Sequence, residues 1–454
     1  MFQRFFDEGL AQSSFLIGCD RTKQAVAIDP RRDAGIYIAA CKQQDFTLTA
    51  AIETHIHADF VSGAHELQAA GVTVIAGPGS NLGYPHREAT DGERMIFGDL
   101  SLTFLATPGH TPEHVAVLAD LRGSRARLFT GDLLFVGAVG RPDLLGEAQT
   151  RELAGDLFAS LQRVMALPDD VEVHPGHGAG SLCGAGIGKE PFSTIGRERE
   201  LNAMLRYADA ETFVSAVLAD LPETPAYFAR MKRINREGPP ILRLLDRRRP
   251  LPAVQPAAAA ALAADGALLL DLRSHEAFAA SHAVGALNFA FGPKIGYWAG
   301  WLLPPDVPIV LLAENPAHAN EAVLQLLRVG LDRVEGIVDG GIAAWRGAAL
   351  PTSSIGRISG AELREALARH DLVQVVDVRT VKEWKAGHID GSVNIPLGEL
   401  QARIRELPTE ARLATICEGG YRSSLASSVI EREGFPEIVN IVGGMAAYRE
   451  LEAT

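Results

Sequence analysis

The second half of the chain carries one sequence pattern twice. LLLDLRSHEAFAASHAVGALNF starts at residue 268 and QVVDVRTVKEWKAGHIDGSVNI starts at residue 374, an offset of 106. This offset places Asp271 opposite Asp377, Arg273 opposite Arg379, His282 opposite His388 and Asn288 opposite Asn394. Within each copy, short β-branched runs alternate with helical stretches, for example 373–378 and 422–433, which is typical of a parallel sheet flanked by helices. We therefore expect two successive copies of one α/β domain.

Two segments suggest where the domains meet. Residues 247–264, RRRPLPAVQPAAAAALAA, combine a basic run with three prolines, which is typical of a surface linker that leads into a short helix. Residues 351–356, PTSSIG, form a small polar stretch between two apolar regions. The predicted domains are 1–250, 256–350 and 357–454.

The second copy contains a cysteine whose sequence surroundings favour a reactive thiolate. In TICEGGYRSSLASSVI, Cys417 follows a buried strand and precedes a glycine-containing loop and a helix. Loop amides and a helix N-terminus stabilise a thiolate and bind anions, and the Arg422 guanidinium adds a fixed charge. We predict a catalytic thiolate, the other reading being a buried structural cysteine. The predicted catalytic residues are Cys417 and Arg422, with substrate binding by Glu418, Gly419, Gly420 and Tyr421.

The first copy lacks this chemistry. Ala313 stands opposite Cys417, His318 stands opposite Arg422, and Pro316 replaces a loop glycine and removes one backbone donor. The middle domain is predicted to be catalytically silent.

With CEGGYRSS as the specific motif, the two copies resemble tandem rhodanese domains, a sulfurtransferase family whose active loop starts at the catalytic cysteine. The resemblance implies two doubly wound α/β domains. It also implies that Cys417 carries sulfur as a persulfide, while Arg422 and the loop amides bind an anionic donor or acceptor.

The first domain is rich in histidine. Eight of the 13 histidines lie between His55 and His177, six of them in THIHADF, TPGHTPEH and HPGHG, and GDLLF adds Asp132. We expect a strand ending at Thr54, so that His55, His57 and Asp59 project from one face. Glycine and proline punctuate the other segments, as is common for loops that present metal ligands. These segments predict a metal site.

Together these motifs resemble the metallo-β-lactamase superfamily across roughly residues 1–235, which implies an αββα sandwich. Family members usually read HxHxDH at the first motif and fill two metal positions, whereas this chain has Phe60 where the last histidine is expected. The predicted ligands are His55, His110 and Asp132, a two-histidine, one-carboxylate set that suits non-haem Fe(II), one ion per chain. Because Asp59 and His177 are present, a weak second site stays open.

Within the superfamily the closest resemblance is to persulfide dioxygenases, supported by GRPDLLG from Gly140, by 181–202 and by the fused rhodanese domains. It implies that a low-molecular-weight thiol persulfide, such as that of glutathione or coenzyme A, reacts with O₂ to give sulfite. It also implies that sulfite, the product of this reaction, takes part in the rhodanese reaction, which interconverts sulfite and thiosulfate. Arg141 is predicted to bind an anionic group of the carrier, with a surface arginine as the other reading.

Other residues near the motifs receive smaller roles. Cys183, six residues after His177, is predicted to contact bound substrate, a small packing residue being equally consistent. His57 is expected to support a ligand rather than bind iron. His65, His86 and His114 are expected to be structural or surface histidines.

Two rival functions stay open. A two-zinc thiolester hydrolase of the glyoxalase II kind would use the same scaffold, and Phe60 argues against it. A non-catalytic sulfur-relay or scaffold protein would use the rhodanese pair for docking, and the intact Cys417 loop argues against it.

Charge and composition limit the partners. The formal charge of −13 over 454 residues gives the whole chain no attraction to nucleic acid or anionic membranes. The start MFQRFFDEGL has no apolar signal region, and four scattered cysteines form no disulfide framework. We expect a soluble cytoplasmic enzyme that binds neither nucleic acid nor membrane, and homo-oligomer formation stays open.

Overall fold

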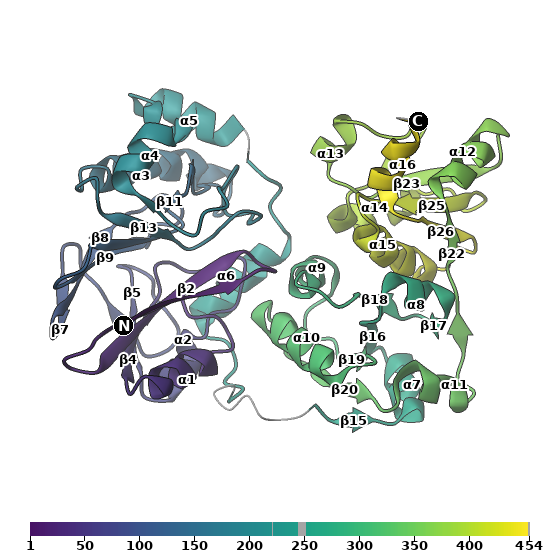
Figure 1. Ribbon diagram of the computed structural model, residues 1–454, viewed down its shortest axis with the longest axis horizontal. Helices are drawn as coiled ribbons and strands as arrows, with labels where there is room; N and C mark the ends of the chain where they lie inside the picture. The colour runs from purple at the N-terminus through teal and green to yellow at the C-terminus, as the bar shows by residue number, and fades with distance from the viewer. Residues whose placement is uncertain (220, 244–250, 453–454) are drawn as a thin grey trace. The chain divides into compact units, whose positions relative to one another are not determined.

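The computed structural model describes residues 1–219, 221–243 and 251–452. Its contacts divide the chain into two compact units, with the main division between residues 249 and 250 and with 327–330 counted in the first unit. In Figure 1 the colour runs from purple to teal over residues 1–243 and from teal through green to yellow over residues 251–452. Residues 247–250 of the predicted linker lie outside the described residues, and its C-terminal part is helix α7 (Pro256–Ala264).

Two mixed sheets form the first unit. Within its described residues each sheet has six strands, in the orders β1-β2-β3-β4-β5-β6 and β14-β13-β10-β9-β8-β7. The strands of the first sheet are β1 (Phe2–Asp7), β2 (Gln12–Cys19), β3 (Gln24–Ile28), β4 (Thr47–Ile52), β5 (Thr73–Ala76) and β6 (Arg87–Glu88). Those of the second are β7 (Arg94–Phe97), β8 (Leu100–Ala106), β9 (Val115–Leu121), β10 (Arg127–Gly131), β13 (Glu172–Pro175) and β14 (Ser193–Thr194).

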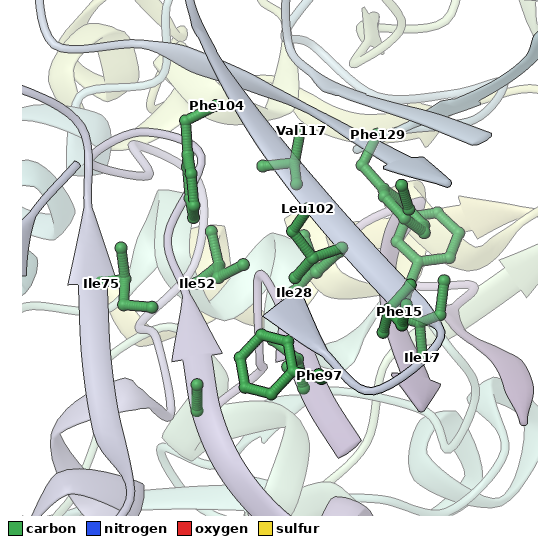
Figure 2. Close-up of a cluster of buried hydrophobic side chains, with 14 of the residues drawn as sticks. Phe15, Ile17, Ile28, Ile52, Ile75, Phe97, Leu102, Phe104, Val117 and Phe129 are labelled. Carbon is green, nitrogen blue, oxygen red and sulfur yellow. The ribbon is translucent and has the colours of Figure 1, made fainter. Parts of the chain in front are cut away.

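Side-chain alternation along β2 explains how the layers form. Every residue of β2 is buried, because the strand lies between β1 and β3 and is covered on both faces. Phe15 and Ile17 join the core between the sheets, whereas Leu16 packs on the outer face with Tyr37 of helix α1 (Gly35–Gln43). Figure 2 shows that inter-sheet core, including Phe104 and Phe129 from the second sheet.

Helices cover the outer face of the second sheet as well. Leu157 of α3 (Glu147–Val164) and Phe213 of α5 (Ala210–Ala219) pack in one cluster with Leu128 of β10. The unit therefore has helix, sheet, sheet and helix layers, which confirms the αββα prediction. Its remaining elements are α2 (Ala64–Ala69), β11 (Leu134–Phe135), β12 (Ala138–Val139), α4 (Ile195–Leu201), η1 (Ala203–Arg206) and α6 (Tyr227–Glu237).

The second unit contains two parallel sheets with one topology. Within the described residues each sheet has five strands, and the order β15-β20-β19-β16-β18 matches β22-β26-β25-β23-β24 position by position. The first sheet comprises β15 (Ala253–Val254), β16 (Leu268–Asp271), β18 (Leu287–Asn288), β19 (Ile309–Leu312) and β20 (Val334–Val338). The second comprises β22 (Gly356–Ile358), β23 (Val373–Asp377), β24 (Val393–Asn394), β25 (Arg412–Ile416) and β26 (Ile438–Ile441).

Helices connect these parallel strands, as parallel pairing requires. In the first copy the helices after α7 are α8 (His275–Ala280), α9 (Ile295–Leu302), α10 (Pro316–Arg328) and α11 (Gly341–Gly347). The second copy has α12 (Gly360–Ala368), α13 (Val381–Lys385), η2 (Leu397–Glu399), α14 (Leu400–Arg403), η3 (Ile404–Glu406), α15 (Tyr421–Arg432) and α16 (Gly444–Glu452). The matching topology confirms the internal repeat and the doubly wound α/β class.

The polar stretch 351–356 is partly regular structure. Thr352–Ser353 forms β21 and pairs with β17 (His282–Ala283) of the first copy, whereas Gly356 begins β22 in the second sheet. The chain therefore passes from one sheet to the next within a few residues. Among the described residues, no helix combines the length and the hydropathy needed to cross a bilayer.

Candidate functional site

Three buried side chains from different loops converge in the first unit. His55 follows β4, His110 lies between β8 and β9, and Asp132 follows β10. The Nε2 atoms of His55 and His110 lie 3.7 and 3.4 Å from Asp132 Oδ2, and each residue is at most 2% exposed. We call these three residues the metal-ligand group, because their ligand atoms all lie within 4.8 Å of one another.

Other contacts fix the orientation of each member. His55 Nδ1 lies 2.9 Å from Thr54 Oγ1, His110 Nδ1 lies 2.8 Å from the Arg141 carbonyl oxygen, and Asp132 Oδ1 lies 2.8 Å from His177 Nδ1. Among the described residues, the converging Nε2, Nε2 and Oδ2 atoms have no hydrogen-bond partner although they are buried. Buried polar atoms are normally satisfied, so this arrangement fits a metal ion.

Protonation in the metal-ligand group also fits a cation. Burial, reinforced by nearby histidines, lowers the pKa of His55, and burial lowers the pKa of His110. Burial opposes ionisation of Asp132, but His177 and the other nearby imidazoles outweigh it and hold the pKa of that carboxyl well below its usual range. Neutral imidazoles and an ionised carboxylate are the forms that bind a metal.

The predicted strand face for His55, His57 and Asp59 is wrong. Strand β4 ends at Ile52, and the three residues lie in the loop that follows, where the Asp29 carboxylate accepts a hydrogen bond from the Thr54 backbone. Because a loop has no period of two, the side chains separate into different groups.

His57 lies beside His55, with ring centroids 4.2 Å apart, but its Nε2 belongs to a different group of side chains. Its Nε2 lies 3.2 Å from Asp29 Oδ1 and 3.3 Å from Glu53 Oε2. Burial opposes its charge, but these carboxylates outweigh burial and raise the pKa of His57 to about 10. Phe60 is buried against the His57 ring, with centroids 4.4 Å apart. The structure thus places an aromatic ring where the resemblance leads one to expect a histidine.

Asp59, His177 and Cys183 form a neighbouring group whose ligand atoms also lie within 4.8 Å. His177 links it to the metal-ligand group, because its Nε2 lies 2.8 Å from Asp59 Oδ2 and its Nδ1 lies 2.8 Å from Asp132 Oδ1. Burial is the largest cause that raises the pKa of the Cys183 thiol, to about 12. The structure brings Cys183 beside His177, and its contact with substrate stays a prediction.

Arg141 has an internal set of partners. It is 1% exposed, donates two 2.7 Å hydrogen bonds to the Asp143 carboxylate, and also donates to the Leu182 carbonyl and the Thr224 hydroxyl. Its backbone carbonyl orients His110. The role predicted for its guanidinium, binding of an anionic carrier group, stays a prediction.

The remaining histidines have protein partners. His114 is buried, and its Nε2 lies 3.1 Å from the Asp132 backbone nitrogen, where it accepts a hydrogen bond. His65 and His86 lie 2.8 Å from the backbone carbonyls of Pro239 and Tyr84. His114 therefore supports the loop that carries Asp132.

Sequence reasoning missed the residues that support the His55 loop from a distance. Asn235 of α6 is buried and donates to the carbonyls of His57 (2.8 Å) and Phe60 (2.7 Å), and it accepts from the Ser62 backbone at 2.8 Å. Glu113 accepts a 2.9 Å bond from the Ile56 backbone. No sequence signal links Asn235 to a loop more than 170 residues away.

The second predicted site lies at the end of β25 in the second copy. We call residues 417–422 the thiol loop. Cys417 is 1% exposed, its Sγ accepts a 3.0 Å hydrogen bond from the Gly420 backbone, and Ser423 Oγ lies 3.5 Å from it. Gly420 has φ +108°, a left-handed conformation that glycine adopts without strain. The loop therefore brings a backbone donor to the thiol.

The other members of the thiol loop have varied surroundings. Glu418 pairs with Arg449 at 2.7 and 3.0 Å, whereas a side chain at Gly419 would meet open space. The Tyr421 hydroxyl is buried and has no hydrogen-bond partner among the described residues. Arg422 donates two 2.7 Å bonds to Glu383, a residue that the sequence analysis did not select.

The first copy has different side chains at the positions that correspond to the thiol loop. Ala313 follows β19 and is buried, and the His318 ring stacks on Phe291 with centroids 3.8 Å apart. Neither residue offers a nucleophile or a guanidinium there.

Family descriptions match both parts of the chain. The metallo-beta-lactamase superfamily matches residues 8–177, and the rhodanese-like domain matches residues 255–348 and 359–451. These matches agree with the two fold types described above.

Similar proteins are known for both parts. A hydroxyacylglutathione hydrolase of Brucella anthropi is 33% identical over 199 residues, which is 42% of this chain and 72% of that protein. The YrkF protein of Bacillus subtilis is 36% identical over 93 residues, 20% of this chain, and the match spans only half of YrkF. A solved metallo-beta-lactamase structure from Staphylococcus aureus subsp. aureus COL is 32% identical with a TM-score of 0.65, covering 74% of this chain and 98% of that one.

The similarity spans 98% of the Staphylococcus chain at 32% sequence identity, so the two chains share sequence as well as fold. The chain therefore belongs to the metallo-β-lactamase superfamily and carries two rhodanese-like domains after its metallo-β-lactamase domain.

Proposed function

We propose that the domain of residues 1–250 is a persulfide dioxygenase with one Fe(II), and that the domain of residues 357–454 is a thiosulfate sulfurtransferase acting through Cys417. The observation that carries the first part is the convergence of His55 Nε2, His110 Nε2 and Asp132 Oδ2, buried and without hydrogen-bond partners among the described residues. Two histidines and one carboxylate leave coordination positions open on non-haem iron.

The dioxygenase substrate is a low-molecular-weight thiol persulfide, R–S–SH, such as that of glutathione or coenzyme A. With O₂ and water it gives R–SH, sulfite and two protons, so that the terminal sulfur gains three oxygen atoms. The iron would supply the redox chemistry between the terminal sulfur and O₂. The chain's own residues bind the ion, keep both imidazoles in the required tautomer through Thr54 and Arg141, and keep the carboxylate ionised.

The sulfurtransferase step uses a different residue. The Cys417 thiolate attacks the sulfane sulfur of thiosulfate, the S–S bond breaks, and sulfite leaves with the electron pair, so that Cys417 becomes a persulfide. In the reverse direction sulfite accepts that sulfur. Because sulfite takes part in both reactions, placing both domains on one chain raises its local concentration.

The main alternative is a two-zinc thiolester hydrolase. The similarity to a hydroxyacylglutathione hydrolase and the presence of Asp59 and His177 beside Asp132 favour it. Phe60 argues against it, because the aromatic ring cannot serve as the expected second-site ligand. A non-catalytic sulfur-relay or scaffold protein would use the rhodanese pair for docking, and the Gly420 amide that donates to Cys417 Sγ argues against it.

Metal analysis separates the two enzyme functions. We expect the purified full chain to contain about one iron and to show no hydrolysis of S-lactoylglutathione. Two retained zinc ions per chain, together with rapid thiolester hydrolysis, would contradict the dioxygenase proposal.

A further inference from the structure

Glu383 contacts the thiol loop from another part of the same domain. Its Oε2 and Oε1 accept hydrogen bonds from Arg422 Nη1 and Nη2, both at 2.7 Å, so the two groups meet through two parallel bonds. Both side chains are partly exposed, at 34% for Glu383 and 19% for Arg422. Paired bonds of this kind fix the direction of a guanidinium as well as its distance.

The Glu383 carboxylate is itself held in place. It stands three residues after Thr380 at the start of α13, and Oε2 also accepts from the Thr380 backbone (3.0 Å) and hydroxyl (2.9 Å) in a capping box. Burial opposes its ionisation, but the bonds from Arg422 and Thr380 outweigh burial and lower the pKa of Glu383 to about 2. The carboxylate is therefore a charged, anchored partner for Arg422 at neutral pH.

One edge of the Arg422 guanidinium stays available. Glu383 takes the edge formed by the two terminal nitrogens, and among the described residues the Nε–H donates to no acceptor. Burial opposes the charge of Arg422, but Glu383, with a smaller contribution from the Cys417 thiolate, outweighs burial and raises the pKa of Arg422. A guanidinium can present two donors along its Nε edge to a second anion while its terminal edge is occupied.

The silent copy provides an internal comparison. Ala277 stands opposite Glu383, so the glutamate is missing from the same copy that has Ala313 and His318 in place of Cys417 and Arg422. Helix α8 of that copy still starts at an N-cap serine without the glutamate. The helix start alone therefore does not require this carboxylate.

Residues that support the scaffold are present in both copies. Asp271 and Arg273 form the same ion pair as Asp377 and Arg379, at 2.6 and 2.7 Å. Glu383 is therefore present only in the copy that has Cys417 and Arg422, unlike the ion pair, which both copies share.

We infer that Glu383 is a positioning residue for sulfur transfer: it fixes Arg422 by its terminal nitrogens so that the Nε edge faces the sulfonate oxygens of thiosulfate or sulfite at Cys417. This inference rests on the proposed sulfurtransferase function and assigns that site an oxyanion-bearing substrate. As the S–S bond of thiosulfate breaks, the departing sulfite takes the electron pair, and the oriented guanidinium faces the same anionic oxygens before and after this step, so its contribution is to binding. Glu383 itself does not contact the substrate.

The test uses the full chain in a thiosulfate to cyanide transfer assay. Glu383→Gln keeps a hydrogen-bond acceptor for the α13 cap but removes the charge that orients Arg422. We expect the KM for thiosulfate to rise about tenfold while kcat stays within about twofold, because the free arginine must be ordered by the substrate itself. In an Arg422→Lys background, Glu383→Gln should have no further effect, since it acts through the guanidinium.

A matched control exists in the same domain. Glu362 forms the equivalent capping box with Ser359 on α12, so Glu362→Gln should leave KM unchanged while changing thermal stability by a similar amount. A lower KM in Glu383→Gln would show that the carboxylate competes with the substrate anion, and an unchanged KM would show that it only caps the helix. Either result overturns the inference.

A second readout does not depend on sulfurtransferase activity. Alkylation of Cys417 by anionic iodoacetate, relative to neutral iodoacetamide, reports on anion binding beside the thiol and is followed by mass spectrometry. The iodoacetate preference should fall several-fold in Glu383→Gln. If the unaltered chain transfers no sulfur, the proposed function fails, but this ratio still decides whether Glu383 positions Arg422: an unchanged ratio contradicts the inference.

Discussion

The metal-ligand group and the thiol loop are constructed in opposite ways. The metal-ligand group takes one side chain from each of three loops, and side chains from other segments support them: Asn235 of α6 holds the His55 loop, and His114 accepts from the Asp132 backbone. The thiol loop is one continuous segment in which Gly420 contacts Cys417 across three residues. The first therefore depends on the packing of the whole unit, whereas in the second the contact to the thiol is local, and Arg422 and Glu418 pair with side chains outside the loop. Changes at a distance should affect the first more than the second.

Removing a member of the metal-ligand group should have the largest effect. Asp132→Ala, His55→Ala or His110→Ala should each abolish iron retention and persulfide-dependent O₂ uptake, because two ligands bind a divalent ion weakly. Metal analysis after gel filtration and an oxygen electrode measure this. His86→Ala, which removes an imidazole outside the group, should retain iron. Full iron content in Asp132→Ala would show that the ion binds elsewhere.

Cys417→Ser should separate the two chemistries. Sulfur transfer should be lost, because serine is a far weaker nucleophile, while iron content and O₂ uptake stay within about twofold. The products, resolved by chromatography, should shift from thiosulfate toward sulfite. A parallel loss of O₂ uptake would contradict independent sites.

Adding Ala313→Cys to Cys417→Ser sharpens this result. The silent copy would then have a thiol at the end of β19, but it would still lack counterparts of Arg422 and Glu383. We expect no recovery of thiosulfate to cyanide transfer. Recovery to a tenth of the original rate or more would show that the cysteine alone is sufficient.

Asn235→Ala tests the long-range support of the metal-ligand group. Loss of its amide leaves the His57 and Phe60 carbonyls without this donor, which costs about 1–3 kcal/mol, and iron affinity should fall about tenfold or more. Asn202→Ala is a matched control, because Asn202 is also buried and bonds to Ala138, Glu198 and Met204. It should lower Tm to a similar extent and keep iron. Equal iron loss in both variants would show that Asn235 contributes only to the general stability of the unit.

Cys183→Ser is expected to have the smallest effect. If the Cys183 thiol contacts bound persulfide, its replacement should raise the KM for persulfide about threefold with kcat little changed. Mass spectrometry after incubation with a persulfide donor should show added sulfur at Cys417, and it tests whether Cys183 accepts any. An unchanged KM with no sulfur at Cys183 would leave it as a packing residue.

The same contrast explains what could be predicted from sequence. CEGGYRSS is contiguous, so its residues stay neighbours in any fold that forms the loop, and the repeat predicted the shared topology. The course of the loop after β4 depends on Asp29, which follows β3 and accepts from the Thr54 backbone, so period-two reasoning assigned His57 to the wrong face. The capping pattern of Thr380 and Glu383 is visible in the sequence, but the pairing of Glu383 with Arg422, 39 residues away, appears only in three dimensions.

The central claim is tested most directly by O₂ consumption of the iron-loaded Cys417→Ser full chain with glutathione persulfide. This variant cannot transfer sulfur from Cys417, so any sulfite that forms accumulates. We predict O₂ uptake that requires iron, with about one sulfite formed for each O₂ consumed, as the balanced reaction demands. Absence of O₂ uptake in protein that retains metal, combined with rapid hydrolysis of a glutathione thiolester, would contradict the account.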